Sequence, residues 1–265
     1  MITSAANVTE RQFVPPSLAI STVIFALRPS ATSGRPTLWL PLVRRIRQPY
    51  RGLWALPGGP LARNESLVAA AGRNLKETTR LEPQYLEQLY CFGAVDRSPA
   101  ERVVSIVYWA LVHADQAAIA QETDNVRWFR ADRLDELAFD HNDIVDYALW
   151  RLRNKVEYGS IAYHLLGERF TLAQLREVYE AVLDKRLDPA NFRRRLRDAP
   201  DIEPTDDYLQ GGRHRPPRLY RYKDATGPPA ERATENRPAA PRQTFATANT
   251  GSPAVEPLQT ANDTE

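Results

Sequence analysis

Apolar and polar positions along the chain predict a mixed α/β fold followed by a smaller helical block. Four segments are rich in Val, Ile, Tyr and Trp, as strands are: Leu18–Arg28, Thr37–Arg44, Leu86–Val95 and Val103–His113. Two longer stretches are typical of helices, Glu65–Thr79 and His141–Val156, and in the second the apolar residues recur at helical spacing on one face. From Ser17 to Val156 we therefore expect one α/β fold.

The block from Glu157 to Lys223 has the pattern of a winged helix-turn-helix. Thr171 and Gln174 form a capping box that opens a helix. That helix is expected to bury Leu172, Leu175, Val178, Tyr179 and Val182. Asp188 and Pro189 start a second helix, which turns Phe192 and Leu196 toward the core. The remaining predicted elements are a short first helix at Ser160–Leu166, a turn at Asp184–Leu187, and paired strands at Ile202–Pro204 and Leu219–Tyr222.

Length and composition divide the chain into four parts. At roughly 100–200 residues per domain, a chain of 265 residues favours two domains. Beyond Asp224, prolines are spread among Ala, Thr, Asn and Glu with few large apolar side chains, so this segment is expected to be disordered. We predict a flexible N-terminus (1–14), an α/β domain (15–156), a winged helix-turn-helix domain (157–223) and a disordered tail (224–265).

Charge and cysteine usage narrow the class of protein. A formal net charge of +2 excludes a histone-like protein that binds nucleic acid by its global charge. The longest apolar run, Leu18–Leu27, is far shorter than the roughly 20 residues that span a bilayer, and the amino terminus lacks the pattern of a signal peptide. The single cysteine, Cys91, excludes an intrachain disulfide and is expected to be a buried strand residue. We therefore expect a soluble cytoplasmic protein.

The first chemical motif is Trp54–Gly59 followed by a predicted helix. Five residues separate Gly59 from Glu65, and seven separate Glu65 from Arg73. This spacing resembles the Nudix box of Nudix hydrolases. A Gly-Gly corner lets the backbone approach a pyrophosphate, and positions 73, 74, 77 and 78 share a face of the helix. In the family, three of these four are carboxylates that hold magnesium against the diphosphate.

The departures from the Nudix pattern predict a binding scaffold without hydrolytic machinery. Asn74 and Thr78 stand where the family has carboxylates, and Arg80 replaces the glycine that ends the helix in the left-handed conformation. One carboxylate, an amide and a hydroxyl are a poor magnesium cage and provide no general base at position 74. We expect no catalytic and no metal-binding residue. The candidate nucleotide-binding residues are Tyr50, Arg51, Gly58, Gly59, Glu65, Arg73 and Glu77.

Other interpretations of this region stay open at this point. The motif could be a chance Leu-Pro-Gly-Gly turn, or hydrolysis could persist with carboxylates such as Glu101 or Glu122 in place of the missing ligands. Trp54 and His113 favour structural roles. His141, at the start of a helix, is as consistent with capping or packing as with contact to a ribose.

The second chemical motif is the run of arginines on the second helix of the helix-turn-helix. Arginine can bind guanine and asparagine can bind adenine in the major groove. The basic loop Gln210–Arg218 has the composition of a wing. An arginine cluster is usually a solvated face, but its place on a recognition helix with a wing favours double-stranded DNA over a protein partner. The candidate DNA contacts are Thr171, Asn191, Arg193, Arg194, Arg195, Arg197, Arg213, His214, Arg215 and Arg218.

A degenerate Nudix domain followed by a winged helix resembles the NrtR family, the Nudix-related transcriptional regulators of NAD metabolism. Besides the Nudix box, the resemblance is carried by Leu137–His141, Arg169–Leu172, Asp188–Leu196 and Arg218–Arg221. It implies a Nudix-like α/β/α sandwich with a mixed sheet. It also implies a homodimeric repressor of NAD biosynthesis or salvage genes that reads a palindromic operator. ADP-ribose, or a related NAD-derived nucleotide, is the implied effector and is expected to weaken DNA binding.

Two competing functions come from other classes of protein. One is an ADP-ribose pyrophosphatase with an accessory winged helix, which would use magnesium or manganese. The other is a nucleotide-sensing adaptor whose winged helix binds protein. The repressor requires no cofactor, and magnesium enters only if hydrolysis persists.

Overall fold

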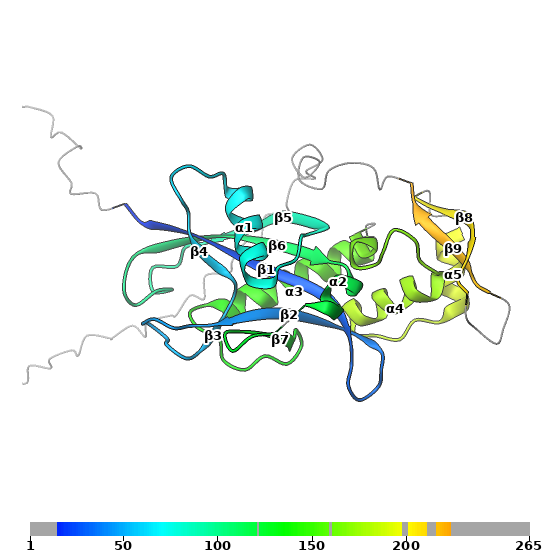
Figure 1. Ribbon diagram of the computed structural model, residues 1–265, viewed down its shortest axis with the longest axis horizontal. Coiled ribbons are helices and arrows are strands. Elements are labelled where there is room, and N and C mark those ends of the chain that lie inside the picture. Colours follow the sequence, from blue (N-terminus) through cyan, green and yellow to red (C-terminus); the bar gives the residue numbers. More distant parts are fainter. Residues whose placement is uncertain (1–14, 121, 159–160, 198–200, 211–215, 224–265) are drawn as a thin grey trace, which may run out of the picture.

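The computed structural model describes residues 15–120, 122–158, 161–197, 201–210 and 216–223, and Figure 1 shows how its elements are arranged. In chain order these are β1 Ser17–Pro29, β2 Pro36–Arg44, β3 Trp54–Ala55, β4 Gly58–Pro60, α1 Leu67–Thr79, β5 Tyr85–Phe92, β6 Val103–Val112, α2 Ala114–Ile119, β7 Val126–Arg130, α3 His141–Tyr158, η2 Ile161–Leu165, α4 Leu172–Leu183, α5 Pro189–Arg197, β8 Ile202–Tyr208 and β9 Arg218–Tyr222. The predicted flexible N-terminus and disordered tail lie outside the described residues. None of the described helices is long and apolar enough to cross a membrane.

The larger lobe is built on a seven-stranded mixed sheet with the central order β3-β2-β1-β6-β5. β1 runs parallel to β6 and antiparallel to β2, and β4 and β7 extend the sheet from β1 and β2. A parallel pair requires a crossover connection. The crossover between β1 and β6 contains the Gly-Gly turn and α1, so the sheet topology fixes where the first motif lies.

Helices cover both faces of this sheet. Val23 and Phe25 of β1 belong to one hydrophobic core, whereas Ile20 and Ile24 belong to the other. α3 packs on the first core and α1 on the second. Because β1 is buried on both faces, its sequence is a continuous apolar run rather than an alternating one. The predicted α/β/α sandwich with a mixed sheet is confirmed.

The long elements agree with the predicted ranges to within a few residues, but several short ones have no sequence signal. β3 and β4 contain two and three residues, and α2 and β7 contain six and five. The first helix of the second block is a 3₁₀ helix. Cys91 is exposed, so the expectation of a buried thiol is wrong. β5 is an edge strand with a register shift between Gln88 and Tyr90, which changes the side chains that face the core.

The smaller lobe contains α4, α5 and the antiparallel hairpin β8–β9. The predicted capping box is present: Thr171 Oγ1 accepts the N–H of Gln174 at 3.1 Å, and Gln174 Oε1 accepts the N–H of Thr171 at 2.8 Å. Most of the predicted inner face of α4 is buried, but Leu172 is only half-buried. On α5, Phe192 is buried and its ring lies 5.2 Å from that of Tyr179. The two helices are therefore held together by an aromatic contact.

The two lobes share one hydrophobic core. The cluster that contains Phe25 and Trp109 of the sheet also contains Leu165 of η2, Val178 of α4 and Phe192 of α5. η2 contacts β6, and α4 contacts β2. The predicted domains are thus packed against each other through buried apolar side chains rather than joined only by a linker.

Arg80 ends α1 in the left-handed conformation, at φ 60°, and its backbone N–H donates to the carbonyl of Lys76 at 2.9 Å. The expectation that this helix lacks a left-handed terminator is therefore wrong. The geometry of the cap persists although the residue is not glycine.

Substituting Arg80 by glycine is expected to raise the free energy of unfolding by up to about 1 kcal/mol, because glycine adopts a positive φ without a Cβ clash. Equilibrium urea denaturation measures the change. Lys76→Gly, inside the same helix, is the control and should lower the free energy by about 0.5–1 kcal/mol. A loss of stability in the Arg80 variant would contradict the prediction.

Candidate functional site

The two glycines of the first motif lie on β4, where Gly58 is opposite Ser21 and Gly59 is opposite Ile20 of β1. A Cβ atom at Gly58 would lie 2.5 Å from the carbonyl oxygen of Ile20, so this position requires glycine. A Cβ atom at Gly59 would lie 3.7 Å from Asn74 Oδ1. The first glycine therefore lets the turn pack on β1, and the second faces α1.

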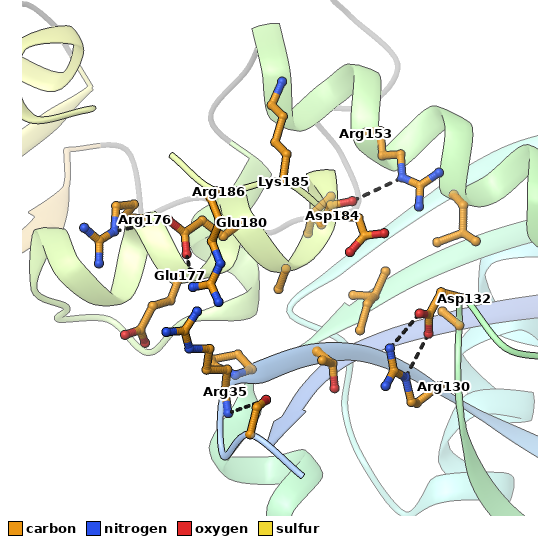
Figure 2. A pocket seen from close by; sticks show the side chains of 18 residues that line it. Arg35, Arg130, Asp132, Arg153, Arg176, Glu177, Glu180, Asp184, Lys185 and Arg186 are labelled. Atoms are coloured by element: carbon orange, nitrogen blue, oxygen red, sulfur yellow. Dashed lines mark hydrogen bonds and ion pairs between the residues drawn. The ribbon is translucent and has the colours of Figure 1, made fainter. Parts of the chain in front are cut away.

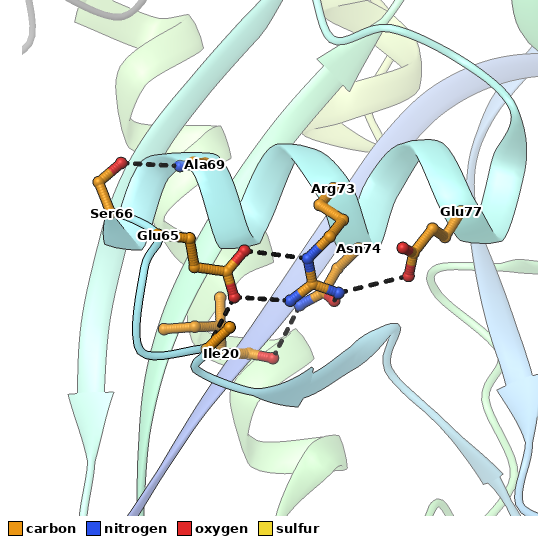
Figure 3. Close-up of polar contacts among 8 residues, drawn as sticks. Ile20, Glu65, Ser66, Ala69, Arg73, Asn74 and Glu77 are labelled. Atoms are coloured by element: carbon orange, nitrogen blue, oxygen red, sulfur yellow. Dashed lines mark hydrogen bonds and ion pairs between the residues drawn. The ribbon is translucent and has the colours of Figure 1, made fainter.

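Arg73 holds the acidic residues of the motif together (Figure 3). Its Nε and Nη2 donate to the two carboxylate oxygens of Glu65 at 3.0 and 2.8 Å, and its Nη1 donates to Glu77 at 3.3 Å. The hydrogen bonds from Arg73, and then that from the N–H of Ala62, lower the pKa of Glu65 to about 2. Glu65 is therefore anionic at neutral pH, and three predicted site residues form one cluster.

Asn74 is 4% exposed and uses both ends of its amide. Its Nδ2 donates to the carbonyl of Ile20 at 3.3 Å, and its Oδ1 accepts from Arg73 Nη1 at 3.3 Å. A carboxylate has no N–H and could not make the bond to Ile20. The amide that replaces a carboxylate of the Nudix pattern thus joins α1 to β1.

The oxygens of this motif do not fit the magnesium ion that a Nudix fold implies. Magnesium needs several oxygen ligands in octahedral geometry. The carboxylate oxygens of Glu65 and the amide oxygen of Asn74 accept hydrogen bonds, and one oxygen of the 64%-exposed Glu77 accepts from Arg73. This leaves one carboxylate oxygen, on Glu77, without a hydrogen bond from these residues. Within the described ranges, no three His, Cys, Asp or Glu side chains gather as a metal site would require.

The carboxylates considered as replacement ligands are bound elsewhere. Glu101 accepts a hydrogen bond from Ser17 at 2.8 Å, and Glu122 pairs with Arg28 at 3.3 Å. Ser17 and Arg28 stand near opposite ends of β1. These contacts do not bring either carboxylate to the Nudix motif.

Tyr50 and Arg51 lie in the connection between β2 and β3, in a second group of residues. The ring of Tyr50 contacts that of Phe139 edge-on at 4.9 Å, and the guanidinium of Arg45 lies 4.5 Å from the Phe139 ring. Tyr50 and Phe139 both have a positive φ, of 63° and 61°. Arg51 lines a cavity of about 280 Å³ together with Arg45 and Asn125. Residues held at an unfavourable positive φ cluster at ligand sites, so this loop is a second candidate surface.

Two residues at the start of α3, Ala138 before it and His141 at its first position, lie between these two groups. The N–H of Ala138 donates to the carbonyl of Trp54 at 2.8 Å, and the N–H of Leu56 donates to Nδ1 of His141 at 2.9 Å. His141 is 6% exposed. Its role is therefore structural: it fixes the strand that leads into the Gly-Gly turn.

Arg97 and Asp140 form a buried bidentate ion pair that the sequence analysis missed. Arg97 Nε and Nη2 donate to the two oxygens of Asp140 at 2.9 and 2.6 Å, and the Arg97 side chain is 5% exposed. The only available signal was that Asp140 belongs to a stretch carrying the family resemblance. No spacing rule connects it to Arg97, which lies 43 residues earlier.

Stability is expected to fall as pH decreases from about 6.5 toward 4. Burial lowers the pKa of His141 to about 4, so the unfolded chain gains a proton in this window while the folded chain does not. The effect is at most about 1.4 kcal/mol per pH unit for each such histidine. Urea denaturation at pH 7, 6 and 5 measures it.

A second, half-buried histidine serves as the internal comparison, because partial burial also lowers the pKa of His164 to about 4. His141→Gln should therefore reduce the pH dependence of stability without abolishing it. An unchanged pH dependence in that variant would contradict the assignment.

α5 presents a basic surface to solvent, with its anchor Phe192 turned inward. Asn191, Arg193, Arg194, Arg195 and Arg197 are all exposed, as predicted, and no acidic residue lies on the helix. The carboxylate of Asp188 accepts the N–H of Asn191 at 2.8 Å and caps the helix. Figure 1 shows α5 and the β8–β9 hairpin at the end of the molecule away from α1.

The exposed side chains of α5 differ in what they contact. Arg194 Nη2 donates to Asn191 Oδ1 at 2.9 Å, and Arg195 Nη2 donates to the backbone carbonyl of Glu157 at 2.6 Å. Arg193 and Arg197 make no hydrogen bond or ion pair to any part of the chain that the structure describes. Arg195 is therefore bound to the end of α3, whereas the guanidinium groups of Arg193 and Arg197 are unpaired within the part of the chain that the structure describes.

The remaining predicted DNA contacts stand as follows. Thr171 is 3% exposed and its hydroxyl serves in the capping box, so its side chain does not present a free surface. Arg218 Nε donates to the carbonyl of Thr205 at 2.7 Å, which ties it across the hairpin. Arg213, His214 and Arg215 lie outside the described residues.

Two family models match the chain. Residues 162–222 match the NrtR DNA-binding winged helix domain, and residues 21–148 match the NUDIX domain. These ranges coincide with the smaller and the larger lobe.

Individual relatives extend the comparison. The ADPR responsive transcriptional repressor NtrR of Acinetobacter baylyi is 34% identical over 224 residues, which cover 82% of this chain and 86% of that protein. The crystal structure of Shewanella oneidensis NrtR complexed with a 27mer DNA superposes with a TM-score of 0.67 and 32% identity, over 78% of this chain and 93% of that chain. An ADP-ribose pyrophosphatase of Methanocaldococcus jannaschii is 33% identical over 111 residues, covering 42% of this chain and 66% of that protein. The first two similarities span both lobes.

Proposed function

We propose, since this chain belongs to the NrtR family, that it is a transcriptional repressor. Its winged helix binds an operator, and its Nudix domain binds ADP-ribose or a related NAD-derived nucleotide. The observation that carries the proposal is the exposed arginine surface of α5. α5 shares a hydrophobic core with the Nudix lobe, and the oxygens of the Nudix motif in that lobe do not fit magnesium. The genes of NAD biosynthesis or salvage are the proposed targets.

The proposed DNA contacts are those of α5 and the hairpin. Arg193 and Arg197 have no hydrogen-bond or ion-pair partner among the described residues, and we propose that they contact bases or phosphates. The Asn191–Arg194 pair would have to open to read a base. Two such helices in a homodimer would read the half-sites of a palindrome about one helical turn apart. The wing residues Arg213, His214, Arg215 and Arg218 are proposed to contact backbone or minor groove.

The proposed nucleotide site uses both groups of residues in the Nudix lobe. The Tyr50 ring offers a stacking surface, and Arg51 offers a cation for the diphosphate. Gly59 and the cluster of Glu65, Arg73 and Glu77 lie along α1 and β4. We propose that this lobe binds without cleaving, since its hydrogen bonds hold the oxygens that metal-assisted hydrolysis would need.

The direct test is operator binding with and without the nucleotide. Bound duplexes are first selected from a random DNA pool, and isotherms for the selected operator are then recorded with and without ADP-ribose. We expect saturable binding that ADP-ribose weakens by about 5- to 150-fold. Clean ADP-ribose binding by a protein that shifts no duplex would instead favour the protein-binding adaptor.

Arg193→Ala is expected to weaken operator binding by about 1–3 kcal/mol if the arginine contacts a base, and to reduce the salt dependence of binding if it contacts a phosphate. Arg176→Ala is the matched control, because it removes an arginine from α4 that pairs with Glu180 instead of lying on α5. Unchanged affinity in the Arg193 variant would remove α5 from the proposed interface.

The alternative function is an ADP-ribose pyrophosphatase, favoured by the retained cluster of Glu65, Arg73 and Glu77 and by the similarity to the ADP-ribose pyrophosphatase of Methanocaldococcus jannaschii. Product formation from ADP-ribose with magnesium or manganese, abolished by Glu77→Gln, would support it.

A further inference from the structure

α3 is attached at its first residue to the Nudix motif. Nδ1 of His141 accepts the N–H of Leu56, three positions before Gly59, at 2.9 Å. The N–H of Ala138 donates to the carbonyl of Trp54 at 2.8 Å. A displacement of the Gly-Gly turn on nucleotide binding would therefore reach the start of α3 directly.

The last turn of α3 is attached to the smaller lobe. Arg195 of α5 donates to the carbonyl of Glu157 at 2.6 Å, and Lys185 lies 4.0 Å from the Glu157 carboxylate. One turn earlier, Arg153 Nε donates to the carbonyl of Val182 at the end of α4, at 3.2 Å. Cations bound at helix C-termini are favourable, because the free carbonyls there carry partial negative charge.

α3 is a continuous helix whose inner face is buried along its length, so we expect it to shift as a rigid body. Its 18 residues span about 27 Å, at 1.5 Å per residue. Ile144, Ala148, Leu152 and Val156 on its inner face are all fully buried. A tightly packed helix of this kind transmits a shift at one end as a shift at the other.

The junction between the lobes leaves room for such a shift. A cavity of about 340 Å³ lies between α4 and the strands β2 and β7 (Figure 2). Each ion pair on its walls joins two residues of the same lobe: Arg130 pairs with Asp132 in the larger lobe, and Arg186 pairs with Glu180 in the smaller lobe. Arg153 is the lining residue that reaches from α3 to α4. A small movement of α4 would therefore leave the wall pairs intact and act on the α3 contacts.

We propose that Arg195 is a positioning residue that sets the orientation of α5 on α3, and that the nucleotide state of the larger lobe changes operator affinity through this contact. The inference rests on the proposed repressor function, and it gives Arg195 a role different from the DNA contact predicted from the sequence. Its guanidinium is already engaged with the α3 carbonyl, unlike those of Arg193 and Arg197.

The test compares variants by the ratio of operator dissociation constants with and without ADP-ribose. Arg195→Ala is expected to reduce this ratio by about three- to tenfold, within the range that coupling energies produce. It should leave unchanged the affinity of the DNA-free protein for ADP-ribose. The salt dependence of DNA binding should also stay unchanged, because no phosphate contact is lost. Arg193→Ala should lower affinity equally with and without ADP-ribose and keep the ratio.

Arg153→Ala provides an independent variant, because Arg153 lies on α3 and not on the DNA-reading helix. It should also reduce the ratio. An Arg195 variant with an unchanged ratio and a salt slope reduced by about one would identify a phosphate contact and overturn the inference. A wild-type protein whose operator affinity ignores ADP-ribose would contradict the proposed function itself, before any variant is made.

Discussion

Phe170→Ala is expected to lower the free energy of unfolding by about 3–5 kcal/mol and to weaken both lobes at once. Phe170 is 1% exposed and belongs to the core cluster that also contains residues of the sheet. Its backbone pairs with Tyr220 at 3.0 and 2.8 Å, so it joins the hairpin to the core as well. Urea denaturation followed by circular dichroism should show one transition with a lower midpoint and an unchanged slope.

Val68→Ala is the control for that experiment, because Val68 is 40% exposed on α1. It should change stability by less than about 0.5 kcal/mol. Two separate transitions in the Phe170 variant, one of them at the wild-type midpoint, would show that the lobes unfold independently and would contradict the shared core.

Asp140→Ala is expected to cost about 3–5 kcal/mol, because it leaves the guanidinium of Arg97 buried without its partner. The Arg97 side chain is 5% exposed, and the pair fixes the start of α3 to the connection between β5 and β6. The same denaturation measurement applies. Replacing both residues by leucine should recover most of the loss, since no buried charge then remains.

Asp132→Ala is the matched control for the buried pair. Asp132 also binds an arginine in bidentate fashion, Arg130 at 2.9 and 2.6 Å, but the two side chains are 28% and 36% exposed. Water screens this pair, so its removal should cost no more than about 1 kcal/mol. Equal losses for Asp132 and Asp140 would argue against burial as the source of the effect.

The long elements of the fold were predictable because their apolar runs or apolar periodicity extend over eight or more residues. β3 and β4 are too short to show a period, and their positions depend on pairing with β2 and β1. The exposure of Cys91 follows from the edge position of β5 and its register shift, neither of which is local to the sequence. Arg80 shows the limit of residue preferences, since a left-handed cap formed without glycine.

The candidate sites were predictable where the residues share one helix. The spacing of the Nudix motif predicted that positions 73 and 77 share a face of the helix, and Arg73 and Glu77 of α1 are in contact. The bonds from Arg73 to Glu65, which precedes α1, were not predicted. Tyr50 instead contacts Phe139, 89 positions away, through ring packing that no spacing rule describes. The exposed face of α5 followed from its amphipathic pattern, but the contact of Arg195 with α3 depends on how the lobes pack.

The continuous apolar interior beneath both lobes has a consequence for the cell. A lesion far from DNA and nucleotide, such as one at Leu152 on α3, would increase the unfolded fraction of the entire chain. Proteases clear unfolded chains, so a loss of one or two kcal/mol can reduce abundance several-fold. The target genes would then be derepressed although the DNA-binding and nucleotide-binding surfaces are intact. A genetic screen for constitutive expression should therefore recover substitutions of buried residues in the Nudix lobe as well as substitutions of the arginines of α5.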